Sequence, residues 1–125
     1  MYLIDTDIII DILRGVKGSK EFLLDLSKEG LFLSVISMAE IFSGRETKDP
    51  VKHEKILRFL SHFEVVPLTQ EIAILGGAIR RDYQVGLADA LIAATAVHKG
   101  LTVVTYNTKH FEKVEGLKIL KPGYR

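Results

Sequence analysis

Apolar residues along this chain gather into short runs, and longer amphipathic segments separate the runs. The runs lack a clean alternation of apolar and polar positions, which is typical of strands buried on both faces of a sheet. The longer segments repeat their apolar residues at helical spacing. The pattern predicts strands at 2–5, 31–35, 64–68, 101–105 and 117–120, and helices at 7–15, 17–29, 37–44, 51–63, 69–84 and 87–100.

The order of these elements predicts the fold class. Strands that alternate with helices indicate a parallel sheet covered on both faces. We therefore expect an α/β fold, a three-layer αβα sandwich with a central, mainly parallel sheet of about five strands. No linker or repeat interrupts the pattern, so residues 1–125 are expected to form a single domain. Gly15 can close the first helix with a positive φ, and Pro67 indicates a strand end or a sheet edge.

Composition and charge limit the class of protein. Hydrophobic residues make up 47% of the chain, which is enough for a real core and argues against disorder. A net charge of +1 argues against binding of polyanions by bulk charge. The chain has no cysteine, and its opening residues, "MYLIDTD", lack the basic region of a signal peptide. No apolar run is long enough for a membrane span, so we expect a cytoplasmic protein that makes no membrane contact.

Four polar residues lie where the predicted topology brings distant segments together. Asp5 ends the first strand, Glu40 lies in the first turn of the helix after the second strand, and Asn107 follows the fourth strand. The carboxyl ends of parallel strands share one edge of an open sheet, and ligands bind at this edge. Asp89 joins the group if the turn before helix 87–100 brings the start of that helix to the same edge. These four residues are the candidate catalytic residues.

Three of these side chains suggest a metal site. Carboxylates that lie close together repel one another, and a divalent cation removes the conflict. Oxygen ligands suit Mg²⁺ or Mn²⁺. Asp5, Glu40 and Asp89 are therefore candidate ligands of such an ion. An ion held in this way can activate water and bind a phosphodiester, so the set favours metal-dependent phosphodiester hydrolysis.

Each candidate also has a structural alternative. Ser37 and Glu40 match the spacing of a capping box at a helix start. Asp89 could stabilise its helix through the helix dipole, and Asn107 could cap the short segment "TKHF". Asp5 has the weakest alternative, because a carboxylate that closes an apolar strand has little structural use.

Other polar residues carry weaker signals. Asp7 could cap the first helix or make an outer contact to a metal, and Asp11 is expected to be solvated. The four histidines show no metal-ligand spacing. Some side chains could contact an RNA backbone, although each is more often ordinary surface: Arg80, Arg81, Lys109 and His110.

Four stretches together resemble the PIN-domain family, and within it the VapC-type toxins of toxin–antitoxin pairs. They are "MYLIDTDIIIDILRG", "SVISMAEIFSG", "LADALIAATAVHKGLTVVTYNTKHF" and "GLKIL", and they cover essentially the whole chain. The resemblance implies an αβα sandwich and an endoribonuclease that depends on Mg²⁺ or Mn²⁺. It also implies a homodimer that is inhibited by a VapB-like, DNA-binding antitoxin.

The resemblance also assigns roles to residues. It makes Asp5, Glu40 and Asp89 the acidic ligands, and it makes Thr6 and Thr105 hydroxyls that orient ligands or water. Asn107 fills the family's fourth position, where Asp is common, which puts a tightly held second metal in doubt. The family often has Asn where this chain has Asp7, so one negative charge is added nearby.

Two other functions remain open on the sequence. "LIDTDIII" resembles the signature of haloacid-dehalogenase-like phosphatases, with Asp5 as nucleophile and Asp7 as acid, but no late acid pair follows a strand. The chain could also be a catalytically degenerate PIN-like binding module, since a fold does not fix a function. Asn107 is the feature that keeps this second alternative open.

Overall fold

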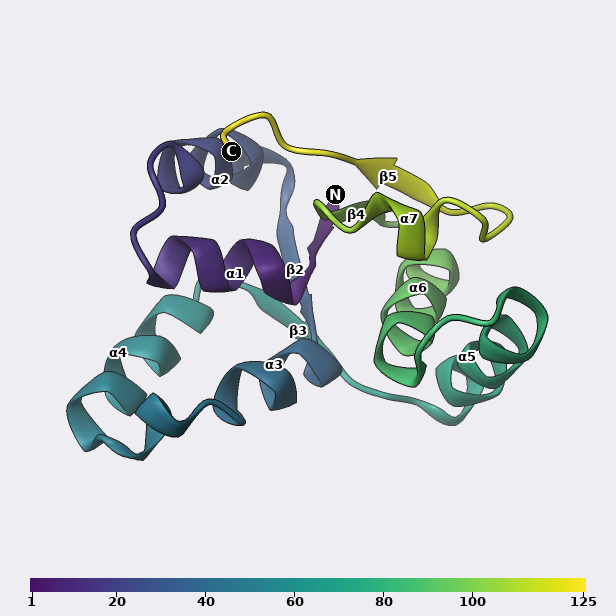
Figure 1. Cartoon of the computed structure of the whole chain (residues 1–125), viewed down its shortest axis with the longest axis horizontal. Coiled ribbons are helices and arrows are strands. Elements are labelled where there is room, and N and C mark those ends of the chain that lie inside the picture. Colours follow the sequence, from purple (N-terminus) through teal and green to yellow (C-terminus); the bar gives the residue numbers. More distant parts are fainter.

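The computed structural model describes residues 1–125 in full. All five predicted strands are present, and helices lie between them (Figure 1). Along the chain the elements are β1 (Tyr2–Ile4), α1 (Thr6–Leu13), α2 (Ser19–Leu26), η1 (Ser27–Glu29), β2 (Leu31–Ser34), α3 (Val35–Phe42), η2 (Arg45–Lys48), α4 (Pro50–Leu60), β3 (Glu64–Val66), α5 (Gln70–Tyr83), α6 (Leu87–Lys99), β4 (Thr102–Val104), α7 (Thr108–Phe111) and β5 (Lys118–Leu120).

The five strands form one all-parallel sheet in the order β3-β2-β1-β4-β5. β3 is an edge strand and ends just before Pro67, as the proline predicted. From β1 the chain builds outward to β3 on one side, and it then returns to add β4 and β5 on the other side. The strand order therefore reverses between β1 and β4, and ligands bind at the carboxyl ends of the strands at such a point.

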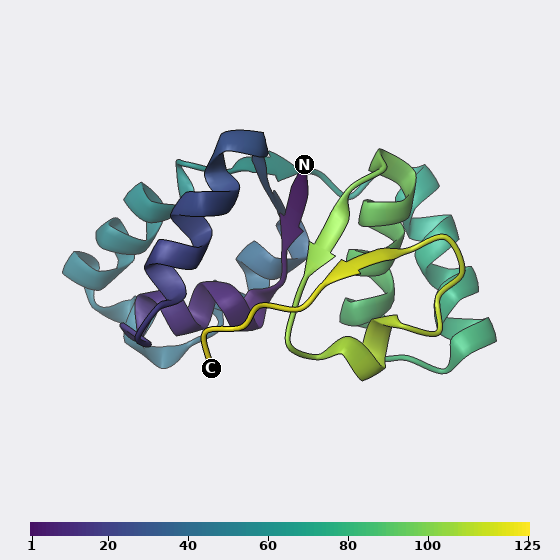
Figure 2. The same ribbon diagram turned by 90° about the horizontal axis from the view of Figure 1, so that it is seen from above.

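Helices cover both faces of the sheet. Leu3 and Val103 face the layer that contains α5 and α6, whereas Ile4 and Val104 face the layer that contains α1, α2 and α4. All four side chains are fully buried, so neither face of the sheet meets solvent here. Figure 2 shows the two layers on opposite sides of the strands. The predicted three-layer αβα sandwich is confirmed.

The start of α3 differs from the prediction. Ser34 caps this helix, and its Oγ accepts a hydrogen bond from the amide of Ile36 at 3.0 Å. Ser37 is buried inside the helix, so the capping-box alternative for Ser37 and Glu40 is not supported. Two serines three residues apart can both satisfy the sequence rule for a cap, and the earlier one does so here. Glu40 consequently lies in the second turn of α3 rather than in the first.

Other helix ends follow their sequence signals. Gly15 has a φ of 72° just after α1, as predicted for a glycine that closes a helix. The predicted helix 17–29 is α2 followed by the 3-10 turn η1, and Gly30 follows with a φ of 90°. No helix of the structure has the length and apolar character needed to cross a membrane.

Gly76 allows α5 and α6 to pack closely. A Cβ atom at this position would lie 2.6 Å from Cδ2 of Leu91 on α6. Gly77, the next residue, has nothing within 4 Å of the same added atom. The sequence predicts that both glycines weaken α5, but only Gly76 has a packing reason to be glycine.

The two glycines give a matched test of this packing. We expect Gly77→Ala to raise stability by about 0.5–1 kcal/mol, because alanine favours the helix. Gly76→Ala must also displace Leu91, so we expect it to be less stable than Gly77→Ala by about 1 kcal/mol or more. Urea unfolding of the two variants measures the difference. Equal stabilities would show that Leu91 can move aside without lowering the free energy of unfolding.

Candidate active site

Asp5 lies at the carboxyl end of β1 and also caps α1. Its Oδ1 accepts a hydrogen bond from the amide of Thr6 at 2.8 Å, and its Oδ2 accepts one from the Thr105 hydroxyl at 2.7 Å. The residue is only 4% exposed. The expectation that this carboxylate has little structural use is therefore wrong, because it joins the start of α1 to the end of β4.

Thr105 extends this arrangement to Asn107. The Thr105 side chain is fully buried, and its Oγ1 accepts a hydrogen bond from the amide of Asn107 at 2.9 Å. Asn107 stands at the N-cap position of α7, but its side chain makes no capping hydrogen bond and is exposed. The Asn107 side chain is thus free to face a ligand, and the helix-capping alternative for it is not supported.

We call the region where Asp5 and Thr105 meet, after β1 and β4, the acidic corner. Asp7 is its second acidic residue. Its Oδ2 accepts a hydrogen bond from the amide of Tyr106 at 3.1 Å, and its Oδ1 is buried without any hydrogen-bond partner. Asp7 does not cap α1, because Asp5 does so. A buried carboxylate oxygen without a donor is costly unless something positive satisfies it.

The surroundings of Asp5 and Asp7 disfavour two negative charges. Burial, the charge of Asp7 and, to a smaller extent, the charge of Asp89 together raise the pKa of Asp5 to about 7. The hydrogen bonds from Thr105 and Thr6 act in the opposite direction on that pKa. Burial also raises the pKa of Asp7, while the Tyr106 amide and the positive charge of Arg125 lower it.

Glu40 and Asp89 flank this corner from two other helices. α3 contacts both α1 and α6, so it bridges the two helical layers. Glu40 is exposed, and its Oε1 accepts a hydrogen bond from the Thr6 hydroxyl at 2.7 Å. Asp89 makes no capping hydrogen bond at the start of α6, and its Oδ2 lies 2.8 Å from Nδ1 of His110. Both side chains are thus engaged with neighbours.

The donor chemistry of the corner suits a hard divalent cation. Asp5 and Asp7 supply carboxylate oxygens, one of which has no partner. An ion there would offset the burial that raises both pKa values and the charge of Asp7 that also raises the pKa of Asp5. No three acidic or histidine side chains lie close enough to hold one ion between them. For Asp5, Glu40 and Asp89 to share an ion, their side chains must come closer together than they lie here. Their joint role as ligands stays a prediction.

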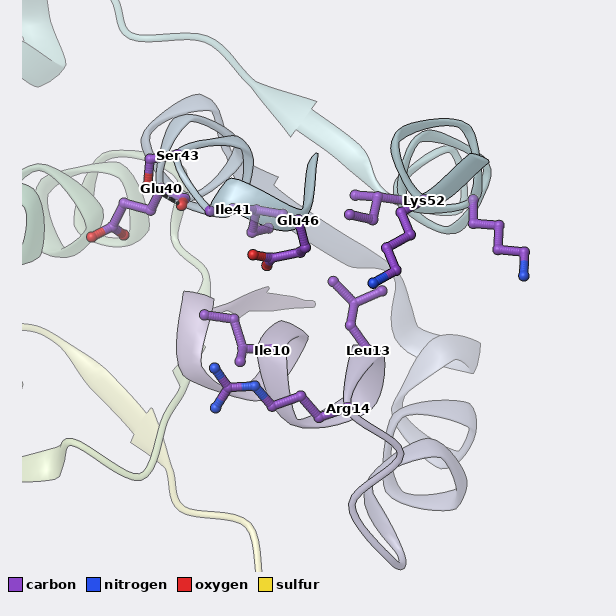
Figure 3. Close-up of a pocket in the computed structure, with 11 residues that line it drawn as sticks. Ile10, Leu13, Arg14, Glu40, Ile41, Ser43, Glu46 and Lys52 are labelled. Carbon is purple, nitrogen blue, oxygen red and sulfur yellow. Dashed lines mark hydrogen bonds between the residues drawn. The ribbon is translucent and has the colours of Figure 1, made fainter. Parts of the chain in front are cut away.

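A groove of about 670 Å³ lies between α1, α3, η2 and α4, with Glu40 at one end. Figure 3 shows Arg14 and Lys52 extending into it from opposite walls, with Glu46 between them. Lys55 also lines it. Apart from Glu40, its lining carries more positive than negative side chains, so the groove suits a polyanion.

Several contacts of the acidic residues were not predicted from the sequence. Asp11 was expected to be solvated, but it is 8% exposed and binds the guanidinium of Arg125, so that expectation is wrong. Tyr106 and His110 also contact the acidic residues. Only the place of Tyr106 directly after a strand could have indicated its role, since the other contacts join segments far apart in the chain.

Comparison with known proteins identifies the architecture. The family model described as the PIN domain matches residues 2–117. Ribonuclease VapC10 of Mycobacterium tuberculosis is 38% identical, over 100% of this chain and 98% of its own length. The tRNA(fMet)-specific endonuclease VapC of Shigella flexneri is 28% identical, over 94% of each chain. A chain of a toxin–antitoxin complex from Klebsiella pneumoniae superposes with a TM-score of 0.83 at 29% identity, covering 100% of both chains.

The raised pKa of Asp5 predicts how stability depends on pH. An unfolded chain has an aspartate pKa of about 3.9, so between about pH 4 and pH 7 the folded metal-free protein binds more protons and loses stability as the pH rises. Asp5→Asn mimics the protonated side chain and should remove this loss. We expect the variant to gain about 2 kcal/mol on wild type between pH 5 and pH 8.

Thermal and urea unfolding in the presence of a chelator measure this gain. Asp25→Asn on the exposed face of α2 serves as the matched control, and its stability should follow that of wild type at every pH. Parallel curves for wild type and Asp5→Asn would show that Asp5 titrates in its ordinary range.

Proposed function

The chain belongs to the PIN-domain family, and we propose that it is a VapC-type ribonuclease, the toxin of a VapBC toxin–antitoxin system, whose cleavage of RNA depends on Mg²⁺ or Mn²⁺. Similarity to a named ribonuclease over the full length supports the RNA substrate. The match to the PIN domain also excludes the haloacid-dehalogenase-like phosphatase that the sequence left open.

The observation that carries the proposal is the corner formed by Asp5, Asp7 and Thr105. A carboxylate that is 4% exposed lies at the carboxyl edge of the sheet where the strand order reverses. The second carboxylate beside it retains a buried oxygen without a partner. Such an arrangement is costly for a protein that only needs to fold, and it is suited to a protein that binds a cation.

The proposed metal site uses Asp5, Glu40 and Asp89, with Asp7 beside it. When bound, Mg²⁺ or Mn²⁺ supplies positive charge to the phosphate and lowers the pKa of water, so that hydrolysis needs no covalent nucleophile. Thr105 and Thr6 orient carboxylates of this set through the hydrogen bonds that they donate to Asp5 and Glu40. Asn107 contributes an amide where the family often has a carboxylate, and it is exposed for contact with RNA.

The partners of the protein follow from the same proposal. A VapB-like antitoxin is the inhibitor, in line with the toxin–antitoxin complex of which one chain superposes on this one. We extend the proposal to a homodimer and to action in the cytoplasm, where RNA substrates are found. Sedimentation of the purified protein tests the dimer directly.

RNA cleavage tests the proposed activity. We expect purified protein to cleave a mixed tRNA substrate with Mn²⁺ or Mg²⁺ and to lose this activity in EDTA. Asp5→Asn and Asp89→Asn should each reduce the rate by more than about 100-fold, the upper limit for residues that only support a ligand. Gel analysis of the RNA products measures the rates.

Asp25→Asn is the isosteric control and should cleave at the wild-type rate. Cleavage that survives in Asp5→Asn would indicate a contaminating nuclease or a different site. A protein that binds Mn²⁺ and RNA but does not cleave would be the degenerate binding module instead.

The groove beside Glu40 gives a separate test of the RNA substrate. We expect Lys52→Ala combined with Lys55→Ala to weaken RNA binding about tenfold and to reduce the salt dependence of binding by about 0.7 per lysine, since each lost phosphate contact releases fewer counterions. Fluorescence anisotropy in the inactive Asp5→Asn background measures both effects.

Lys28→Ala combined with Lys99→Ala removes the same charge near the amino ends of the strands, where both lysines are exposed. This control should bind RNA as the parent protein does. Equal weakening by both pairs would mean that only net charge attracts RNA, and not the groove.

A further inference from the structure

Asp11, which is buried, and Arg125, which is exposed, form an ion pair that joins residue 125 to α1. The guanidinium donates from Nε to Asp11 Oδ2 at 2.9 Å and from the second nitrogen, Nη2, to Oδ1 at 3.1 Å. The hydroxyl of Tyr124 also donates to Asp11 Oδ2, at 2.6 Å. Both carboxylate oxygens are thus bound, and a bidentate contact of this kind fixes orientation as well as distance.

Arg125 also holds Tyr106, which follows β4. Its guanidinium carbon lies 4.3 Å from the centre of the Tyr106 ring, and its backbone amide donates to the Tyr106 hydroxyl at 2.8 Å. The ring of Tyr124 packs edge-on against Tyr106, with centres 5.2 Å apart. Arg125 therefore contacts the ring face and the hydroxyl of Tyr106, and Tyr124 contacts its ring.

Tyr106 in turn belongs to the segment that completes the acidic corner. Its amide donates to Asp7, and the amide of its neighbour Asn107 donates to Thr105, whose hydroxyl donates to Asp5. The contacts of Arg125 thus reach Asp5 through one short segment of backbone, residues 105–107. Arg125 itself is not one of the residues of the proposed metal site and does not contact Asp5.

We propose that Asp11 and Arg125 form a clasp that positions residues 105–107 against Asp5, which makes Arg125 a positioning residue for RNA hydrolysis. This inference rests on the proposed function. The clasp acts on geometry: without it, Thr105 and Asn107 lose the fixed backbone that aims them at the corner. A displacement of about 1 Å in such a site can reduce a rate by up to about 100-fold.

Kinetics and hydrogen exchange of clasp variants test the proposal. We expect Arg125→Ala and Asp11→Asn each to lower kcat about tenfold while KM changes less than about twofold, because RNA binding in the groove is untouched. The double variant should be no worse than either single variant, since both remove one interaction. Arg125→Lys keeps the charge but not the bidentate contact, so it should restore only part of kcat.

Hydrogen exchange measures the same effect without metal or RNA. The amides of Tyr106 and Asn107 should exchange about tenfold faster in Arg125→Ala, while the amides of the central strands exchange as in wild type. Global destabilisation would instead accelerate all of them together. This measurement decides on the clasp even if wild-type protein fails to cleave RNA, so failure of the clasp and failure of the proposed function are distinguishable.

Arg58 supplies a control. Its Nε lies 3.7 Å from Oε1 of Glu54, and both side chains are exposed on α4. Arg58→Ala should leave kcat and the exchange of residues 105–107 unchanged. Unchanged kcat and unchanged exchange in Arg125→Ala would overturn the clasp, as would a loss confined to KM.

Discussion

Burial of the Asp5 carboxylate demands compensation from several directions, because a charge that is 4% exposed cannot rely on water. The start of α1 supplies an amide and the end of β4 supplies a hydroxyl. Both donors are in reach because β1 and β4 are neighbours in register, with Ile4 opposite Val104. The strand order of the sheet therefore brings together the donors that a buried carboxylate needs at this position. Asp7 then adds a second charge that this arrangement leaves only partly satisfied.

Much of the fold could be predicted because its signals are local. Apolar runs without alternation marked each strand. Pro67 marked the end of β3 and Gly15 marked the end of α1, through constraints that act within a few residues. The start of α3 could not be fixed in this way. Ser34 and Ser37 are both plausible caps, and the choice between them depends on where β2 stops in the sheet. That is a property of the packed molecule rather than of the sequence nearby.

Candidate acidic residues could be chosen from the sequence, but their hydrogen-bond partners could not. Asp5 was recognisable from its place at a strand end, and its burial at the edge of the sheet agrees with that reasoning. The hydroxyl of Thr6 on Glu40 and the imidazole of His110 on Asp89 arise from contacts across 34 and 21 residues. Asp11 was misjudged for the same reason, because its partner Arg125 lies 114 residues away. Rules based on the spacing of residues in the sequence apply to near neighbours, so they cannot predict contacts over such separations.

The hydrogen bond between Thr105 and Asp5 has a consequence for synthesis of the protein on the ribosome. It spans 100 residues, so the strand that carries Asp5 emerges early and waits for its neighbour. β2 can pair with β1 long before β4 exists, but the corner lacks one wall until Thr105 leaves the exit tunnel. The acidic corner therefore cannot assemble on the ribosome until the chain has grown by the 100 residues that separate Thr105 from Asp5. The topology thus sets a delay between the first folded contacts and the completed corner.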